Sequence, residues 1–204
     1  MNKKFMQRLS VALLLVISSY AYSQGLLKYN PPKTGSPMTL AGGGTRSFGA
    51  KIPIKILAPR HTGLTSKSQP VLYWYSSLPK PQKLLLTITK EGDDQPALQV
   101  HLDNEPAQGL HSVRLVDYRF FLLEGSVYRW SVAVDDEEQN AGEAISNQTY
   151  VTLRYSFPSI PIDSLEELAA AGYWYDVLQE LIETHSPQLD DWLAEAGIVV
   201  PIWE

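Results

Sequence analysis

Apolar and polar residues alternate with a period of two through the middle of the chain, most clearly in residues 127–134. One face of this run carries Tyr128, Trp130, Val132 and Val134, and the other carries Arg129, Ser131 and Ala133. Such alternation with aromatic and β-branched residues predicts a half-buried strand. Just ahead, Leu122, Gly125 and Tyr128 have the spacing of a tyrosine corner, in which a Tyr hydroxyl bonds to backbone slightly upstream.

Further strand-like runs occur on both sides of this segment and are separated by turn residues. They are Ile52–Leu57, Pro70–Ser76, Lys83–Lys90, Ala97–Leu102, Leu110–Val116 and Thr149–Tyr155. About seven short strands with frequent turns are typical of a β-sandwich. We therefore predict a mainly β domain over residues 50–157, an antiparallel sandwich of immunoglobulin or fibronectin-III type. Alternation in the second run places Trp74 in the core, together with Trp130.

The period changes to that of a helix in residues 158–204. Asp163 or Ser164 starts a capping box with the following glutamates, which predicts a short helix that ends near Gly172. A second helix carries its apolar stripe on Trp174, Val177, Leu178, Leu181 and Ile182. Ser186 and Pro187 predict the start of a third helix, which ends at Gly197. The tail after it is apolar, so we expect the helices and tail to form a small appendage docked on the β domain.

Two segments precede the predicted β domain. Residues 1–23 have the three parts of an export signal: cations at Lys3, Lys4 and Arg8, an apolar run over 9–17, and small residues before Gln24. The alternative is a transmembrane anchor, but the run is shorter than the roughly 20 residues that a spanning helix needs. Residues 24–49 are rich in Pro and Gly and are interpreted as a linker. We therefore expect an exported protein, periplasmic or extracellular.

Composition narrows the function classes. The chain has no cysteine, which excludes disulfides, thiolate metal sites and Cys nucleophiles. Removing residues 1–23 would take three of the 17 Lys and Arg and none of the 22 Asp and Glu, so the net charge would move from −5 to −8. An acidic chain disfavours nucleic acid and anionic membrane as partners.

Several motifs, taken in order, resemble a secreted bacterial family that is mostly cyanobacterial, the domain-of-unknown-function family 928. They are Gly42–Arg46, Gly63–Thr65 with Pro70, Tyr128–Trp130, Gly172–Leu178 and Trp192–Ile202. The resemblance implies a compartment and a fold but no activity. Relatives often carry two cysteines that are missing here. The Gly-Tyr-Trp-Tyr-Asp stretch also resembles part of a tetratricopeptide hairpin, which needs a neighbour to bury its face.

No motif for catalysis or for a cofactor is present. His61, His101, His111 and His185 lack metal-ligand spacing, although His101 and His111 lie on successive predicted strands. Asp135–Glu138 is either a cation-binding loop or a charged hairpin tip, and the second interpretation is favoured because consecutive carboxylates point in different directions. We therefore expect a protein that is not an enzyme and holds neither metal nor cofactor.

Two surfaces are candidates for a partner. If Trp74 points inward, Tyr73 and Tyr75 stand on the outer face, where they either bind a sugar or a protein or are covered by the helices. Covering is slightly favoured, because Trp174 and Trp192 need a surface to pack on. On the second predicted helix, Asp176, Gln179, Glu180 and Glu183 form an acidic face with no evident task inside the molecule. The sequence thus predicts a non-catalytic binding or scaffolding module of the bacterial envelope that acts through protein–protein contacts. The alternatives are a polysaccharide-binding module and an enzyme with an unrecognised site.

Overall fold

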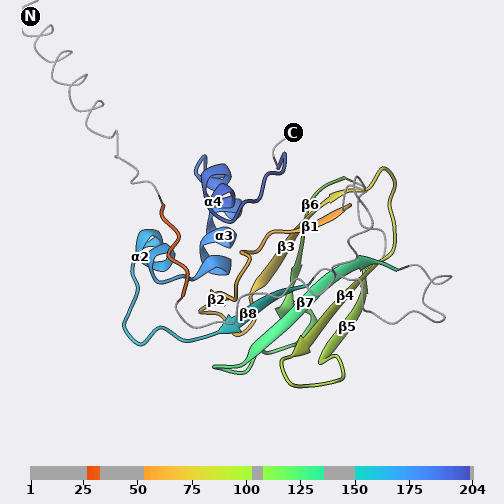
Figure 1. The fold of residues 1–204 in the computed structure, drawn as a ribbon, viewed down its shortest axis with the longest axis horizontal. Helices are drawn as coiled ribbons and strands as arrows, with labels where there is room; N and C mark the ends of the chain where they lie inside the picture. Colours follow the sequence, from red (N-terminus) through yellow and green to blue (C-terminus); the bar gives the residue numbers. More distant parts are fainter. Residues whose placement is uncertain (1–26, 33–52, 103–107, 136–149, 203–204) are drawn as a thin grey trace, which may run out of the picture.

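The computed structural model describes residues 27–32, 53–102, 108–135 and 150–202. It is mainly β, with two sheets followed by three helices (Figure 1). The strands are β1 (Ile54–Ile56), β2 (Gly63–Thr65), β3 (Val71–Ser77), β4 (Leu84–Lys90), β5 (Leu98–Leu102), β6 (Gln108–Arg114), β7 (Val127–Val134) and β8 (Val151–Tyr155). A single 3-10 turn, η2 (Leu115–Tyr118), follows β6.

The smaller sheet has the order β1-β3-β6 and is antiparallel. The larger has the order β2-β8-β7-β4-β5, with β7 as its middle strand and one parallel pair, β2 with β8. The alternation in β7 is confirmed in part: Tyr128, Trp130 and Val132 are buried, but Ser131 of the opposite face is buried too and Val134 is only partly buried. Trp74 in β3 is also fully buried, as predicted, and its ring stacks on His111. Both sheets contribute to one continuous core.

Two details of the strands differ from the prediction. β2 was not expected, since a three-residue strand that contains glycine has no alternation to detect. β6 ends at Arg114 because the chain then turns into η2, so Val116 lies outside the strand and is half exposed.

The helices are α2 (Leu165–Ala170), α3 (Trp174–Glu183) and α4 (Leu189–Glu195). The capping box is confirmed: the Ser164 hydroxyl accepts from the Glu167 amide, and the Glu167 carboxylate accepts from the Asp163 amide. Ser186 accepts from the Gln188 amide, but the α-helix begins only at Leu189, after a turn. No helix within the described ranges is long and apolar enough to cross a membrane.

The helices pack on the side of the sheets where β2 and β3 lie (Figure 1). The apolar stripe of α3 is buried as predicted, and Trp192 and Leu193 of α4 join the same core. The tail also docks: Ile198 is buried, and the Lys55 ammonium on β1 donates to the Val199 carbonyl. Residues 27–32, part of the segment interpreted as a linker, pack against the helices, with Leu27 and Tyr29 buried.

Candidate functional site

The two tyrosines proposed as exposed partner residues are buried. Tyr73 is 5% exposed and Tyr75 is 6% exposed. Their face of β3 is covered from two directions. Burial, together with the nearby Glu183 of α3, raises the pKa of Tyr73 to about 12. Lys55, which lies across from Tyr75 on β1, donates a hydrogen bond to the C-terminal tail. Of the two alternatives for this face, the structure therefore shows the favoured one, in which the helical appendage covers both tyrosines.

One residue of the predicted acidic face of α3, Asp176, is buried, contrary to the expectation. Asp176 is 5% exposed and accepts hydrogen bonds from both the amide and the hydroxyl of Ser66. Burial raises the pKa of its carboxyl, while the bonds from Ser66 act in the opposite direction. Asp176 therefore has a task inside the molecule, which is to hold the segment after β2 against α3.

The other three residues of this face reach the surface. The Lys67 ammonium donates to Oε1 of the Gln179 side chain at 2.7 Å, and Nε2 of the same side chain donates to the Glu183 carboxylate at 2.7 Å. Glu180 is exposed, and its carboxylate makes no hydrogen bond or ion pair within the described residues. Of the acidic residues proposed for a partner, Glu180 is thus the one left without an intramolecular role there.

The sequence motif Gly172–Leu178 lies where α3 meets the sheets. The Trp174 indole donates to the Leu57 carbonyl at 3.0 Å, and the Trp130 indole donates to the Tyr175 hydroxyl at 3.1 Å. The Tyr175 ring also requires a glycine at position 63, where an added Cβ would lie 2.9 Å from it. These polar contacts are buried and mutually satisfied, as a structural network requires. These contacts therefore join α3 to the larger sheet and to the segment ahead of β2.

The remaining chemical candidates do not assemble into a site. His101 lies on β5 and is exposed, whereas His111 lies on β6 in the other sheet and is buried. Asp135 is largely buried and pairs with His101 at 2.8 Å, so it does not belong to a solvated hairpin tip. Asp136–Glu138, the rest of the proposed cation loop, lies outside the described residues. Among the residues that the structure describes, no three His, Asp or Glu side chains could hold a metal together.

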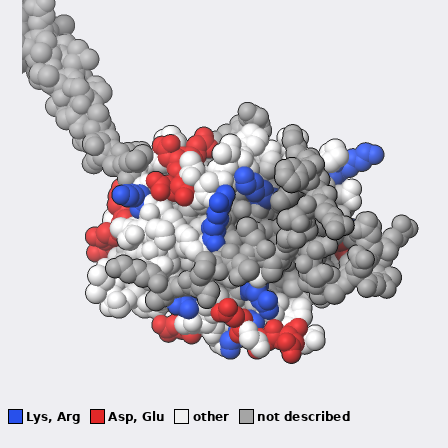
Figure 2. Space-filling model, in the orientation of Figure 1, with Lys and Arg blue, Asp and Glu red and all other residues white. Residues whose placement is uncertain are grey.

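The charges visible on one face of the molecule do not form a uniform field. Figure 2 shows carboxylates gathered over the helical end, with both signs interspersed elsewhere on that face. Asp190 and Asp191 in the first turn of α4 and Glu166 and Glu167 of α2 are acidic residues of that end. Mixed surface charge of this kind keeps a protein soluble and selects no ligand by itself.

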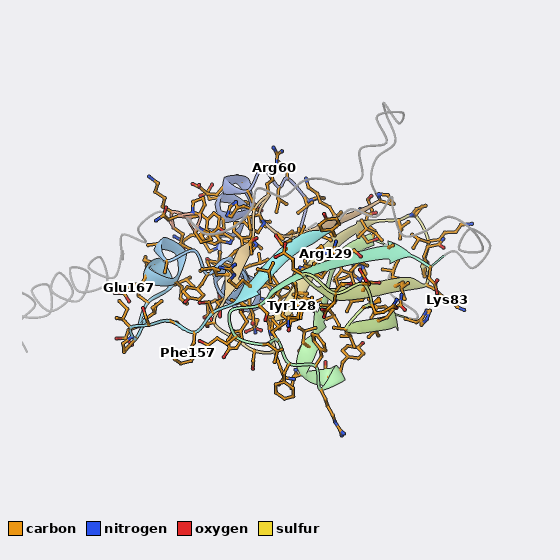
Figure 3. All side chains as sticks on the ribbon, turned by 60° about the horizontal axis from the view of Figure 1, so that its bottom comes forward. Arg60, Lys83, Tyr128, Arg129, Phe157 and Glu167 are labelled. Atoms are coloured by element: carbon orange, nitrogen blue, oxygen red, sulfur yellow. The ribbon has the colours of Figure 1, made fainter. Side chains whose placement is uncertain are left out.

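Large exposed apolar side chains gather in the connection between β6 and β7. We call this the β6–β7 surface: Val116, Tyr118, Phe121 and Leu123, which are 50%, 38%, 59% and 58% exposed. Phe157, 66% exposed, lies two residues beyond Tyr155, whose carbonyl accepts from the Gly125 amide of the same connection. Figure 3 shows Phe157 at the periphery of the molecule and Tyr128 well inside it.

The connection that carries this surface is held at several points. Leu115 and Leu122 are buried, and their amides donate to the carbonyls of Pro70 and Ser68. The Tyr128 hydroxyl accepts from the Leu123 amide at 3.0 Å, which confirms the tyrosine corner. The ring of Phe120 lies edge-on to that of Tyr128. Apolar side chains are therefore presented to solvent by an anchored backbone, so they do not need to be ordered on binding.

The β6–β7 surface was not predicted from the sequence, because strands and helices were predicted from the period of their apolar residues. Residues 117–121, between the predicted strand that ended at Val116 and the tyrosine corner that begins at Leu122, have neither a period of two nor of 3.6, so no element was predicted there. A usable signal was present: a connection next to a tyrosine corner with three aromatic residues within four positions, Tyr118, Phe120 and Phe121. Apolar residues in a connection that has no element of its own to pack are candidates for a binding surface.

Comparison with known proteins gives one family. A family model described as Domain of Unknown Function (DUF928) matches residues 41–196, which include every strand and helix described above. A comparison with the curated proteins gives no match.

Proposed function

The chain belongs to the family described as Domain of Unknown Function (DUF928), and we propose that it is an exported, non-catalytic binding module that engages a protein partner through the β6–β7 surface. The observation that carries this proposal is the exposure of four large apolar side chains within eight consecutive residues. Contiguous apolar patches on a soluble protein mark interaction sites more often than chance. Aromatic residues are also enriched at the centres of protein interfaces.

A protein is favoured as the partner over a sugar. The surface combines two aliphatic side chains, Val116 and Leu123, with two aromatic ones, and aliphatic groups have no stacking face for a sugar ring. Arg114, close to this surface in sequence, already donates two hydrogen bonds to the Asp117 carboxylate. Tyr73 and Tyr75, on which the polysaccharide alternative depended, are buried and therefore offer no surface to a sugar ring.

The finer fold and the compartment belong to the same proposal. The tyrosine corner and the two-sheet core support an immunoglobulin- or fibronectin-like sandwich, and α2 with α3 supports a hairpin of tetratricopeptide type. The succession of cations, apolar run and small residues in 1–23 supports export to the bacterial envelope. An envelope protein would account for a binding surface without a catalytic centre.

Site-specific photo-crosslinking in the native envelope tests the function. A photoreactive amino acid at Phe121 or at Leu123 should give a discrete adduct, and the same group at the exposed Glu166 of α2 serves as control. A photoreactive amino acid in place of Tyr118 should give the same adduct, and Phe121→Asp together with Leu123→Asp should abolish it without changing stability, since both side chains are more than half exposed. Equal adduct formation at Glu166, or an adduct that survives the double substitution, would count against the β6–β7 surface.

A further inference from the structure

Residues 27–32 lie against the helices although they are more than 130 residues away from them in sequence. Figure 1 shows this segment running between α2 and α3. Leu27 is 3% exposed and Tyr29 is 5% exposed, whereas Lys28 between them is exposed. Alternate side chains are thus inserted and presented to solvent, as in an extended peptide laid in a groove.

The ring of Tyr29 fills a slot made of aromatic side chains. It stacks on His61 at 5.3 Å between centroids, and it meets Trp174 and Trp192 edge-on at 5.0 and 5.3 Å. Its hydroxyl is hydrogen-bonded to Nε2 of His61 at 2.7 Å. Edge-on and stacked rings at these distances are favourable beyond the area they bury. Burial lowers the pKa of His61, which favours an uncharged slot.

The backbone of residues 27–32 contacts the helices as well as its side chains. The Asn30 amide donates to the Ala169 carbonyl at the end of α2 at 3.3 Å. Gly172, with φ of +86°, lets the segment approach: an added Cβ would lie 2.9 Å from the Asn30 carbonyl oxygen and 3.1 Å from Pro32. Pro31 and Pro32 restrict the segment to an extended conformation, which lowers the entropy lost on docking.

We propose that this slot, formed by His61, Trp174, Trp192 and Gly172, is a peptide-recognition site for an extended segment with Leu and Tyr two residues apart followed by Pro. Its occupant is the chain's own segment 27–32, which leaves the slot and binds it again. The segment belongs to no sheet or helix, and its single backbone bond to the rest of the molecule is the one from Asn30 to Ala169 among the described residues. This site is separate from the β6–β7 surface, and the proposal does not rest on the function assigned to that surface.

The test keeps the full mature chain and cuts the connection. A protease recognition sequence is inserted between Gly44 and Thr45, and the folded protein is cleaved there. The released fragment should stay bound, as seen by native mass spectrometry. An excess of a synthetic peptide of residues 25–32 should displace it, followed with a fluorescent label on the fragment. A Tyr29→Ala peptide should displace the fragment at least about tenfold less well, since a large aromatic anchor is lost. A Lys28→Ala peptide is the matched control and should act like the parent.

Each other outcome overturns the proposal. Unfolding on cleavage would show that the segment is an integral part of the core. Loss of the fragment with no response to the peptide would show that the slot does not recognise it. Retention against millimolar peptide would show that it does not exchange, and equal displacement by the Tyr29→Ala peptide would remove the aromatic slot from recognition.

Discussion

The indole nitrogen of Trp130 donates a 3.1 Å hydrogen bond to the hydroxyl of Tyr175, so the middle strand of the larger sheet is tied directly to α3. Both side chains are 1% exposed. The Tyr175 hydroxyl also lies 3.5 Å from the Thr152 carbonyl on β8. This contact makes the helical part continuous with the β core, and the first prediction follows from it.

Tyr175→Phe should lower the free energy of unfolding by about 1–3 kcal/mol, because it leaves the buried Trp130 indole N–H without an acceptor. The measurement is the denaturant midpoint at constant slope. Tyr118→Phe is the control, since Tyr118 is 38% exposed and its hydroxyl makes no hydrogen bond within the described residues. Equal midpoints for the two variants would mean that the Trp130–Tyr175 bond contributes nothing.

Trp174→Ala should destabilise the whole protein by about 3–5 kcal/mol in a single cooperative transition. The side chain is fully buried between Tyr29 and Trp192, and its indole donates to the Leu57 carbonyl. Fluorescence and circular dichroism should report the same midpoint. Two separate transitions would show that the helices unfold as a tethered unit.

Asp176 and Glu180 should respond differently to loss of charge. Asp176→Ala should cost about 1–3 kcal/mol, because the partly buried Ser66 amide and hydroxyl lose their acceptor. Glu180→Ala should change stability by less than about 0.5 kcal/mol, since the side chain is exposed. Chemical denaturation of both variants checks this, and similar losses in the two would contradict the buried role of Asp176.

The contribution of Asp176 should also depend on pH. Burial raises its pKa above the ordinary value of 3.8 in spite of the bonds from Ser66. A carboxyl with a raised pKa holds its proton better in the folded state, so the wild type should lose stability relative to Asp176→Asn as pH rises from 3.8 through the raised pKa. The denaturant midpoint of the wild type minus that of Asp176→Asn, measured from about pH 4 to about pH 8, should therefore fall. A constant or rising difference would reverse the assigned direction.

Gly172→Ala should be more damaging than Gly125→Ala. Both glycines have positive φ, +86° and +73°, so both substitutions carry the left-handed penalty of roughly 1–2 kcal/mol. An added Cβ at Gly125 meets nothing within 4 Å, whereas at Gly172 it meets the Asn30 carbonyl at 2.9 Å. The excess loss in Gly172→Ala, read from thermal or denaturant midpoints, reports the contact with segment 27–32. Equal losses would show that this contact is not formed.

Local features were predictable from the sequence alone, because each depends on residues close together in the chain. The alternation in β7, the hydrogen bond of Tyr128 to the Leu123 amide and the cap at Ser164 are of this kind. The apolar stripe of α3 was equally visible, and the order of motifs was enough to indicate the family. In each case the signal and the contact lie within one element or its immediate neighbour.

The tertiary structure decided what covers each face. Alternation shows that Tyr73 and Tyr75 share one side of β3, but only distant segments determine that α3 and the tail cover it. In the same way, no pattern within α3 reveals that Ser66 meets Asp176, 110 residues apart. The β6–β7 surface is the converse case, where apolar residues remain exposed because no other described segment packs on them. The period of the apolar residues shows which side chains lie on the same face of an element. Burial depends instead on contacts between parts of the chain that are far apart in sequence, and such contacts produce no local pattern.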